Sequence, residues 1–238
     1  MRPPTLLALS LPILVLSLSL AIPARAQIGV SLSAETDYRY HGVSLTGGKP
    51  DLSLNLSYDH GSGLYAGASA IGTQGPRGDV RALGFVEYVG FVARTGAETA
   101  WDAGVNHSNL TVDVIRPYTY DYSEYYVGLL KNNYSFHLYY SPNYLGQGVN
   151  TIYADLDGAV RPAAHWRLFA HAGVLTSTGG GRAPDGRQER YDVRAGVAAE
   201  FGGGEVRLAW TAISPYAEYP AGRMQSRDAL VLGASYYF

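Results

Sequence analysis

The chain has 238 residues, no cysteine and a formal net charge of −2, with 18 Lys and Arg against 20 Asp and Glu. These values exclude disulfides and thiolate metal sites, and they leave no basic surface for nucleic acid. The 20 tyrosines and 29 glycines favour strands separated by turns. Beyond the first residues, no segment is apolar over the ~20 residues that a transmembrane helix needs. We therefore expect an all-β protein.

Residues 1–26 have the layout of a cleaved secretory signal peptide. Arg2 precedes a run of Leu, Ser, Val and Ile over residues 6–20, and Ala-Arg-Ala at 24–26 is a small-x-small cleavage site. An uncleaved membrane anchor is the alternative, although Pro12 interrupts the run. No cysteine follows the site, which excludes a lipoprotein anchor. The expected mature domain is residues 27–238.

Alternation of apolar and polar residues between turn signals predicts twelve strands. Their ranges are 28–41, 51–60, 64–72, 82–94, 101–108, 120–130, 133–141, 151–161, 165–176, 189–201, 205–213 and 227–238. The connections alternate long and short, and both chain ends lie among the short ones. Outer-membrane barrels of Gram-negative bacteria have this layout, with short periplasmic turns and long external loops. We expect one transmembrane, antiparallel, up-and-down β-barrel surrounded by outer-membrane lipid.

The last strand supports this choice over a soluble, lipocalin-like periplasmic barrel. Apolar and aromatic residues occupy every second position up to the final residue, among them Leu232, Tyr236 and Phe238. A terminal aromatic residue preceded by this alternation resembles the signal by which the barrel-assembly machinery recognises its substrates for insertion. A soluble barrel would instead direct its apolar face inward.

The first strand sets the expected orientation of the two faces. Ile28, Val30, Leu32 and Ala34 are expected to face lipid, with Tyr38 and Tyr40 near the outer interface. The opposite face carries Glu35, Asp37, Arg39 and His41 along the lumen wall toward the outer mouth.

Two other strands are ambiguous. In 82–94, Glu87 shares a face with Leu83 and Phe85, so either this face lines the lumen or a bulge switches the phase. In 64–72 the side chains on both faces are small, so the sequence does not indicate which face lines the lumen.

The N-terminal third resembles the TorF-type porin family, which carries the Gcw_chp-type domain. The resemblance rests on DYRYHGVS at 37–44, Lys49-Pro50, YDH at 58–60 and GLYAG at 63–67. Weaker matches follow at 124–128 and 140–144. The family usually has a second Arg where this chain has His41. The resemblance implies an outer-membrane barrel and a channel, and it adds little about the solute.

If the polar faces point inward, acids outnumber arginines in the lumen. The acids are Glu35, Asp37, Asp51, Asp59, Asp102, Glu124, Asp155, Asp157, Asp192, Glu200 and Glu205, and the arginines are Arg39, Arg161, Arg167, Arg194 and Arg207. Such a lumen favours cations. We expect a passive diffusion pore for small hydrophilic solutes with a weak cation preference. The alternative is that these charges pair across strands and fill the lumen, because twelve strands fall between filled eight-stranded and open 16-stranded barrels.

Other functional classes have less support. An outer-membrane lipid hydrolase would need a nucleophile beside its base, but His107 and Ser108 are adjacent on a strand and so face opposite sides. His165 and His171 lie too far apart on one face to share a metal, and His137 could approach one of them only as a cross-strand pair. We expect no enzyme activity, cofactor or metal. A glycan-binding or adhesin role for the external loops, which deletion of the loop 214–226 would test, stays open, as do the solute, the oligomeric state and gating.

Overall fold

The computed structural model describes residues 27–75, 77–113, 117–180, 188–214 and 228–238. The predicted signal peptide at 1–26 and most of the loop 214–226 lie outside the described residues. In the described part of the chain, no helix is long and apolar enough to cross a membrane.

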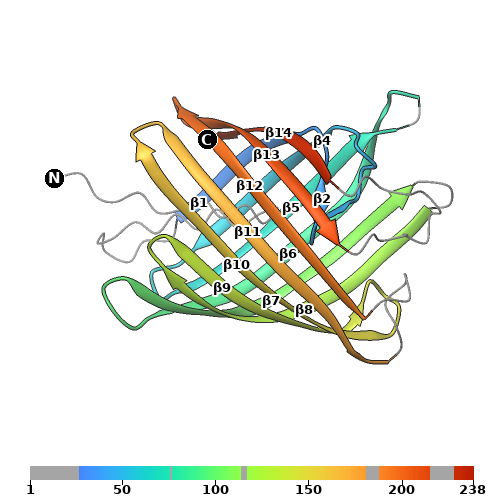
Figure 1. The fold of residues 1–238 in the computed structure, drawn as a ribbon, viewed down its shortest axis with the longest axis horizontal. Helices are drawn as coiled ribbons and strands as arrows, with labels where there is room; N and C mark the ends of the chain where they lie inside the picture. Colours follow the sequence, from blue (N-terminus) through green and yellow to red (C-terminus); the bar gives the residue numbers. More distant parts are fainter. Residues whose placement is uncertain (1–26, 76, 114–116, 181–187, 215–227) are drawn as a thin grey trace.

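Twelve antiparallel strands form a closed barrel, in which each strand pairs with its neighbours in sequence and β1 pairs with both β14 and β4 (Figure 1). The expected up-and-down β-barrel is therefore confirmed. The strands are β1 (Gln27–Glu35), β4 (Asp51–Asp59), β5 (Leu64–Gln74), β6 (Val80–Arg94), β7 (Thr99–Asp113), β8 (Pro117–Lys131), β9 (Tyr134–Tyr144), β10 (Val149–Ala163), β11 (Trp166–Gly179), β12 (Glu189–Phe201), β13 (Gly204–Ser214) and β14 (Asp228–Tyr237). Two further strands, β2 (Arg39–Tyr40) and β3 (Val43–Ser44), pair only with each other.

Turn lengths differ between the two ends of the barrel. At the end that holds the start of β1 and the end of β14, the connections are short, at 60–63, 95–98, 132–133, 164–165 and 202–203. At the other end, the predicted strands 101–108 and 120–130 leave residues 109–119 as a long loop, and this prediction is wrong. There β7 and β8 stay paired as far as Asp113 and Pro117, with the side chains of Thr111 and Thr119 hydrogen-bonded across the pair at 3.0 Å. Cross-strand pairing thus extends this hairpin beyond the expected strands.

The outer face of the barrel is apolar and the inner face is polar. Large exposed apolar side chains cover the outside, among them Ile28, Leu54, Trp101, Leu156 and Trp210. Serine, aspartate, glutamate, arginine and histidine side chains are buried inside. A soluble barrel has the opposite arrangement, and a continuous exposed apolar belt of this kind suits contact with lipid. The lipocalin-like alternative is therefore wrong.

A bulge in β6 resolves the ambiguous strand. Leu83 is buried inside, whereas Phe85 is exposed outside, and Gly84 between them has φ +144°. The register with β5 shifts at the same level, between Ile71 and Gly72. The extra residue reverses the phase of the strand. Glu87 therefore faces outward and does not line the lumen.

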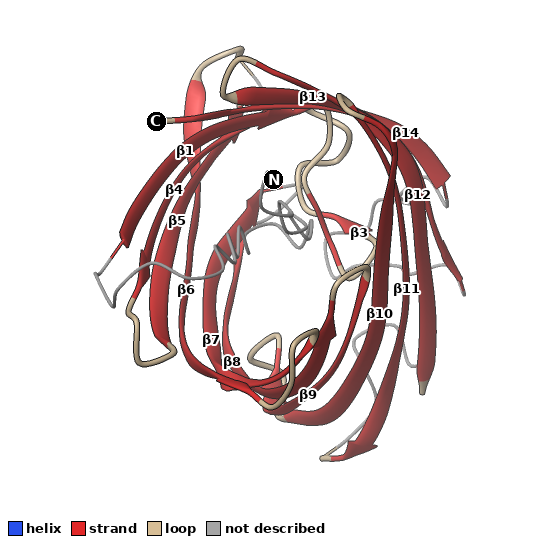
Figure 2. Cartoon of the chain, turned by 90° about the vertical axis from the view of Figure 1, so that its left-hand side faces the viewer, coloured by secondary structure: helices blue, strands red, loops and turns tan. Residues whose placement is uncertain are grey.

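The first predicted strand, 28–41, is wrong in its second half. β1 ends at Glu35, and residues 36–50 leave the wall and turn into the barrel, where they form the β2–β3 hairpin (Figure 2). Tyr38 and Tyr40 do not face the outer interface; they are 2% and 6% exposed and pack inside. We call residues 36–50 the inward segment.

Candidate functional site: the lumen

A two-residue turn builds the tip of the inward segment. His41 and Gly42 connect β2 to β3 and both have positive φ, at 45° and 74°. This is the backbone of a type I′ hairpin turn, which favours glycine at its second position. A non-glycine residue with positive φ is uncommon, and histidine is among those that adopt it more readily. The turn presents the His41 ring to the barrel wall.

Asp37 holds the inward segment together. One carboxylate oxygen accepts hydrogen bonds from the Thr46 hydroxyl at 3.0 Å, from the Gly48 amide at 3.1 Å and from the Ser44 hydroxyl. The other oxygen accepts a 2.6 Å bond from Arg39 Nε. Charge-assisted bonds of this kind are stronger than neutral ones. Asp37 and Arg39 thus organise the inward segment itself and are not part of the strand wall.

Aromatic and aliphatic side chains pack the inward segment against the wall. Tyr38, Tyr40, Val43 and Leu45 belong to one buried cluster with residues from many wall strands. The wall strands contribute Ile71, Leu83, Val86, Leu110, Tyr120, Tyr122, Tyr139, Tyr144, Tyr153, Leu175 and Ile213, and the turn after β9 contributes Leu145. The Tyr40 hydroxyl also donates to Glu124 on β8. The inward segment therefore narrows the lumen where it packs.

His41 is buried between aromatic rings. Its ring stacks on Tyr153 with centroids 3.9 Å apart and on Tyr40 at 4.1 Å. Burial lowers the pKa of His41 to about 3, although the nearby Asp192 carboxylate opposes this change. The imidazole is therefore neutral at ordinary pH, and it acts as an aromatic packing group.

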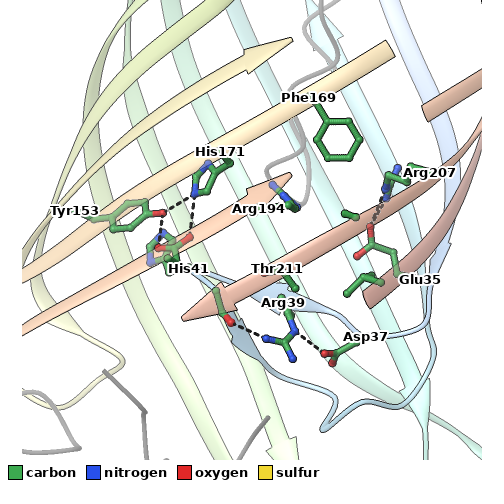
Figure 3. Close-up of a pocket in the computed structure, with 14 residues that line it drawn as sticks. Glu35, Asp37, Arg39, His41, Tyr153, Phe169, His171, Arg194, Arg207 and Thr211 are labelled. Carbon is green, nitrogen blue, oxygen red and sulfur yellow. Dashed lines mark hydrogen bonds and ion pairs between the residues drawn. The ribbon is translucent and has the colours of Figure 1, made fainter. Parts of the chain in front are cut away.

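A polar pocket lies beside the inward segment (Figure 3). The inward segment contributes Asp37, Arg39 and His41 to its lining, and the wall contributes the rest. The remaining lining residues are Glu35, Gly42, Tyr153, Phe169, His171, Asp192, Arg194, Arg207, Ala209, Thr211 and Val231. Charges of both signs therefore surround the same space.

Arginines pair with some of the lumen acids. Arg207 bonds Glu35 through two of its nitrogens and reaches Glu205 at 3.1 Å. Arg167 bonds Glu205 at 2.5 Å, and Glu200 accepts a 2.7 Å bond from Arg161. These side-chain bonds connect β1, β10, β11, β12 and β13, in addition to the backbone hydrogen bonds between neighbouring strands.

Histidines pair with four other lumen acids. His171 on β11 lies between Asp157 and Asp192, at 2.9 Å and 3.0 Å. His137 on β9 lies between Asp102 at 3.3 Å and Asp155 at 3.6 Å. Together these six residues form a band across five of the wall strands from β7 to β12. We call them the Asp–His band.

The structure places the predicted selectivity residues in two groups. Glu35, Glu124, Asp155, Asp157, Asp192, Arg194, Glu200 and Arg207 point inward from wall strands, and Arg161 bonds Glu200 at the rim. Asp37, Arg39 and His41 lie on the inward segment instead. Sequence reasoning missed Arg190, which is 5% exposed on the inner face of β12. Arg190 lies two residues before Asp192 and four before Arg194, so the alternation of a strand would have placed it on the same inner face.

The residues considered for a hydrolase do face opposite ways. His107 points outward and Ser108 is fully buried inside. His107 instead contacts Ser123 across the outer face of β8 at 3.1 Å, and its other ring nitrogen is 3.7 Å from Asp121. That second distance is too long for the hydrogen bond by which an acid orients a catalytic histidine.

Two predicted insertion residues, Leu232 and Tyr236, lie on the outer face of β14, and Phe238 directly follows this strand. Leu232 and Tyr236 are half exposed and Phe238 is 77% exposed. The rings of Tyr236 and Phe238 meet edge to face, with centroids 5.0 Å apart. This end of the barrel therefore presents an aromatic pair to its surroundings.

Solved porins share this fold. The NanC porin aligns with a TM-score of 0.60 and 9% identity, over 87% of this chain and 98% of that chain. The KdgM porin aligns with a TM-score of 0.52 and 10% identity, over 88% of this chain and 99% of that one. A KdgM structure in complex with disordered oligogalacturonate gives 0.50 and 9%, over 88% and 99%. At such identities the likeness concerns the fold alone.

No curated protein matches the sequence. The Gcw_chp family, described as a bacterial protein of unknown function, matches residues 22–225. This match covers most of the barrel, including the inward segment and the Asp–His band. The chain is therefore a member of the Gcw_chp family.

Proposed function

We propose that the protein is an outer-membrane channel of a Gram-negative bacterium that lets small hydrophilic solutes diffuse passively, with a weak preference for cations. Within the family, we assign it to the TorF-type porins. The observation that carries the proposal is a closed barrel with an apolar exterior and a charged interior that holds a polar pocket. In this proposal residues 1–26 are a cleaved signal peptide, and residues 27–238 are inserted by the barrel-assembly machinery.

The balance of charge supports the cation preference. The ion pairs of the described chain match arginines with Glu35, Asp37, Glu200 and Glu205. The four aspartates of the Asp–His band pair with two histidines. Excess carboxylate along a lumen attracts cations. Oligogalacturonate, the ligand in the KdgM complex, is a chain of sugar acids; an acidic lumen disfavours such a polyanion.

The inward segment supports a second candidate function, a filled barrel without conductance. Tyr38, Tyr40, Val43 and Leu45 pack against wall residues from β5 to β13. This packing reduces the lumen to the space beside the inward segment. We favour a constricted channel, because a pocket lined by charged groups of both signs remains beside the inward segment.

Single-channel recording in planar bilayers tests the proposal. Purified, refolded barrel is added to one side, and the conductance and the reversal potential are measured under a KCl gradient. Discrete current steps, together with a reversal potential of the sign expected for a pore that prefers potassium over chloride, support the channel. The folding control is a gel mobility that changes on boiling, as it does for a folded barrel. If protein that passes this control gives no current steps, the filled barrel is established instead. Lipid hydrolysis by the same sample would contradict both readings.

A further inference from the structure

The two histidines of the Asp–His band are held in the same way. His171 directs Nε2 to Asp192 at 3.0 Å and Nδ1 to Asp157 at 2.9 Å. The Tyr153 hydroxyl lies 3.0 Å from the same Nε2 and donates to Asp192 at 3.1 Å. Both ring nitrogens of His171 thus face a carboxylate oxygen, and Nε2 additionally lies beside the Tyr153 hydroxyl. When Nε2 carries the proton, the lone pair of Nδ1 points toward β10.

His137 repeats this arrangement on the other side of β10. Its Nε2 lies 3.3 Å from Asp102, which also accepts a 2.6 Å bond from the Tyr65 hydroxyl. Its Nδ1 is 3.6 Å from Asp155 and makes no hydrogen bond. Both Nδ1 atoms therefore face the two aspartates of β10.

The two aspartates of β10 lack the partners that buried carboxylates need. Asp155 and Asp157 are two residues apart on the inner face, and they are 1% and 4% exposed. Neither oxygen of Asp155 makes a hydrogen bond, and Oδ2 of Asp157 makes none. A buried carboxylate oxygen without a hydrogen bond is costly, and two carboxylates side by side repel each other. A cation between them would remove both costs.

The distances allow one ion to bind them. One carboxylate oxygen each from Asp155 and Asp157 and a ring nitrogen of His171 all lie within 4.8 Å of one another. Ligands held tetrahedrally at about 2.0–2.2 Å from zinc are roughly 3.4 Å apart. Small side-chain rotations would close the difference. His171 and Asp192 also line the polar pocket, which gives an ion a route to the site.

We propose that Asp155, Asp157 and His171 bind one divalent transition-metal ion, Zn²⁺ being the best fit, and that Asp192 holds His171 in the ligating orientation. Imidazole together with carboxylate suits zinc, whereas Mg²⁺ and Ca²⁺ prefer oxygen ligands alone. A metal-bound histidine that gives its second N–H to a carboxylate is a common arrangement around zinc. His137, whose Nδ1 is 3.6 Å from Asp155, offers a further donor. The site stands whether or not the barrel conducts.

Metal content of the whole barrel tests the proposal. The chain is purified without a polyhistidine tag, treated with chelator, equilibrated with ZnCl₂ and passed through a desalting column before elemental analysis. We expect one zinc per chain, not displaced by a thousandfold excess of Mg²⁺ or Ca²⁺. No retained zinc, or equal displacement by Mg²⁺, would overturn the proposal.

Three variants and a control locate the ion. Asp157→Asn and His171→Gln should abolish retention of zinc, and Asp192→Asn should weaken zinc binding about 10–100-fold, as expected for a residue that orients a ligand. Asp59→Asn, which alters a lumen acid on β4 far from the band, should retain one zinc. Retention by Asp157→Asn equal to that of Asp59→Asn would place any zinc elsewhere and refute the site.

A measurement on the unaltered chain covers variants that fail to fold. Folding of each variant is checked by its mobility on unboiled gels. Co²⁺ bound to the unaltered chain should show visible absorption bands of mixed nitrogen and oxygen coordination, and these bands should vanish when one equivalent of Zn²⁺ is added. A spectrum equal to that of hydrated Co²⁺ would contradict the proposal without any substitution.

Discussion

His41 and Tyr153 stack face to face with their ring centroids 3.9 Å apart, although one belongs to the inward segment and the other to β10 of the wall. The pair fixes the tip of the inward segment against the strand that carries Asp155 and Asp157. This contact therefore couples the position of the inward segment, and with it the width of the lumen, to the geometry of the Asp–His band. The following predictions test that link.

Gly42→Ala should detach the tip of the inward segment. A Cβ at this position would lie 2.5 Å from the Cβ of Asp192, and φ is +74°. The close approach adds to the ~1–2 kcal/mol that an alanine pays for a left-handed backbone. We expect a larger single-channel conductance than in the unaltered protein and a lower temperature for the change in gel mobility.

Gly47→Ala is the matched control. Its φ is +64°, but nothing lies within 4 Å of the added Cβ. It carries the backbone cost without the collision, so its conductance should stay near that of the unaltered chain. Equal conductance increases in both variants would show that backbone strain, and not contact with Asp192, explains the effect.

Acid should loosen the inward segment. Burial lowers the pKa of His41 from 6.5 to about 3, so the docked ring stays neutral while an undocked ring takes up a proton below pH 6.5. The docked state therefore loses about 1.4 kcal/mol per pH unit between these values, or about 2 kcal/mol at pH 5. The penalty is absent above pH 6.5. We expect conductance to rise between pH 7.5 and pH 5.

His41→Asn separates this effect from other acid effects. Asparagine also adopts a left-handed backbone readily, so it keeps the turn while removing the titrating group. The rise between pH 7.5 and pH 5 should be lost in this variant. An unchanged rise would assign the pH dependence to the lumen carboxylates.

The strand pattern was predictable from sequence because a lipid belt outside and a polar lumen inside impose strict alternation. Segments such as 189–201 alternate throughout, and β12 has the predicted bounds. In β6, the same alternation is broken at Gly84, and sequence alone could not choose between a bulge and an apolar lumen face. Pairing with β5 decides this, because the register shift lies opposite the glycine.

The inward segment escaped prediction because its residues continue the alternation of β1. Period two describes a hairpin inside the barrel as well as a strand in its wall. The signal that distinguishes them is local: His41-Gly42 between aromatic residues is a two-residue turn signal, and Asp37 precedes the hydroxyls of Ser44 and Thr46. The Asp–His band was not predictable, because the register between β9, β10, β11 and β12 decides which aspartate meets which histidine.

Charge reversal in the lumen should change ion selectivity. Asp59 points inward at the short-turn end of β4, and no arginine pairs with it among the ion pairs of the described residues. Asp59→Lys should therefore move the reversal potential under a KCl gradient toward the chloride value, with little loss of stability. Glu98→Lys is the control, because it makes the same charge change on the exposed turn 95–98. Equal shifts in both variants would argue against selection by lumen charge.

Phe238→Ala should impair insertion in cells more than folding in vitro. The Phe238 ring is 77% exposed and touches only Tyr236 among the described aromatic rings, so its removal costs little packing. The backbone bond from its amide to the Val30 carbonyl, 3.0 Å long, is kept. Refolding in detergent should therefore proceed as in the unaltered chain, while the amount of barrel in the outer membrane falls severalfold. Phe201→Ala, which removes another exposed outward phenylalanine, should leave that amount unchanged. A matching loss in both variants would mean that exposed aromatic area on the outer face, and not Phe238 in particular, governs insertion.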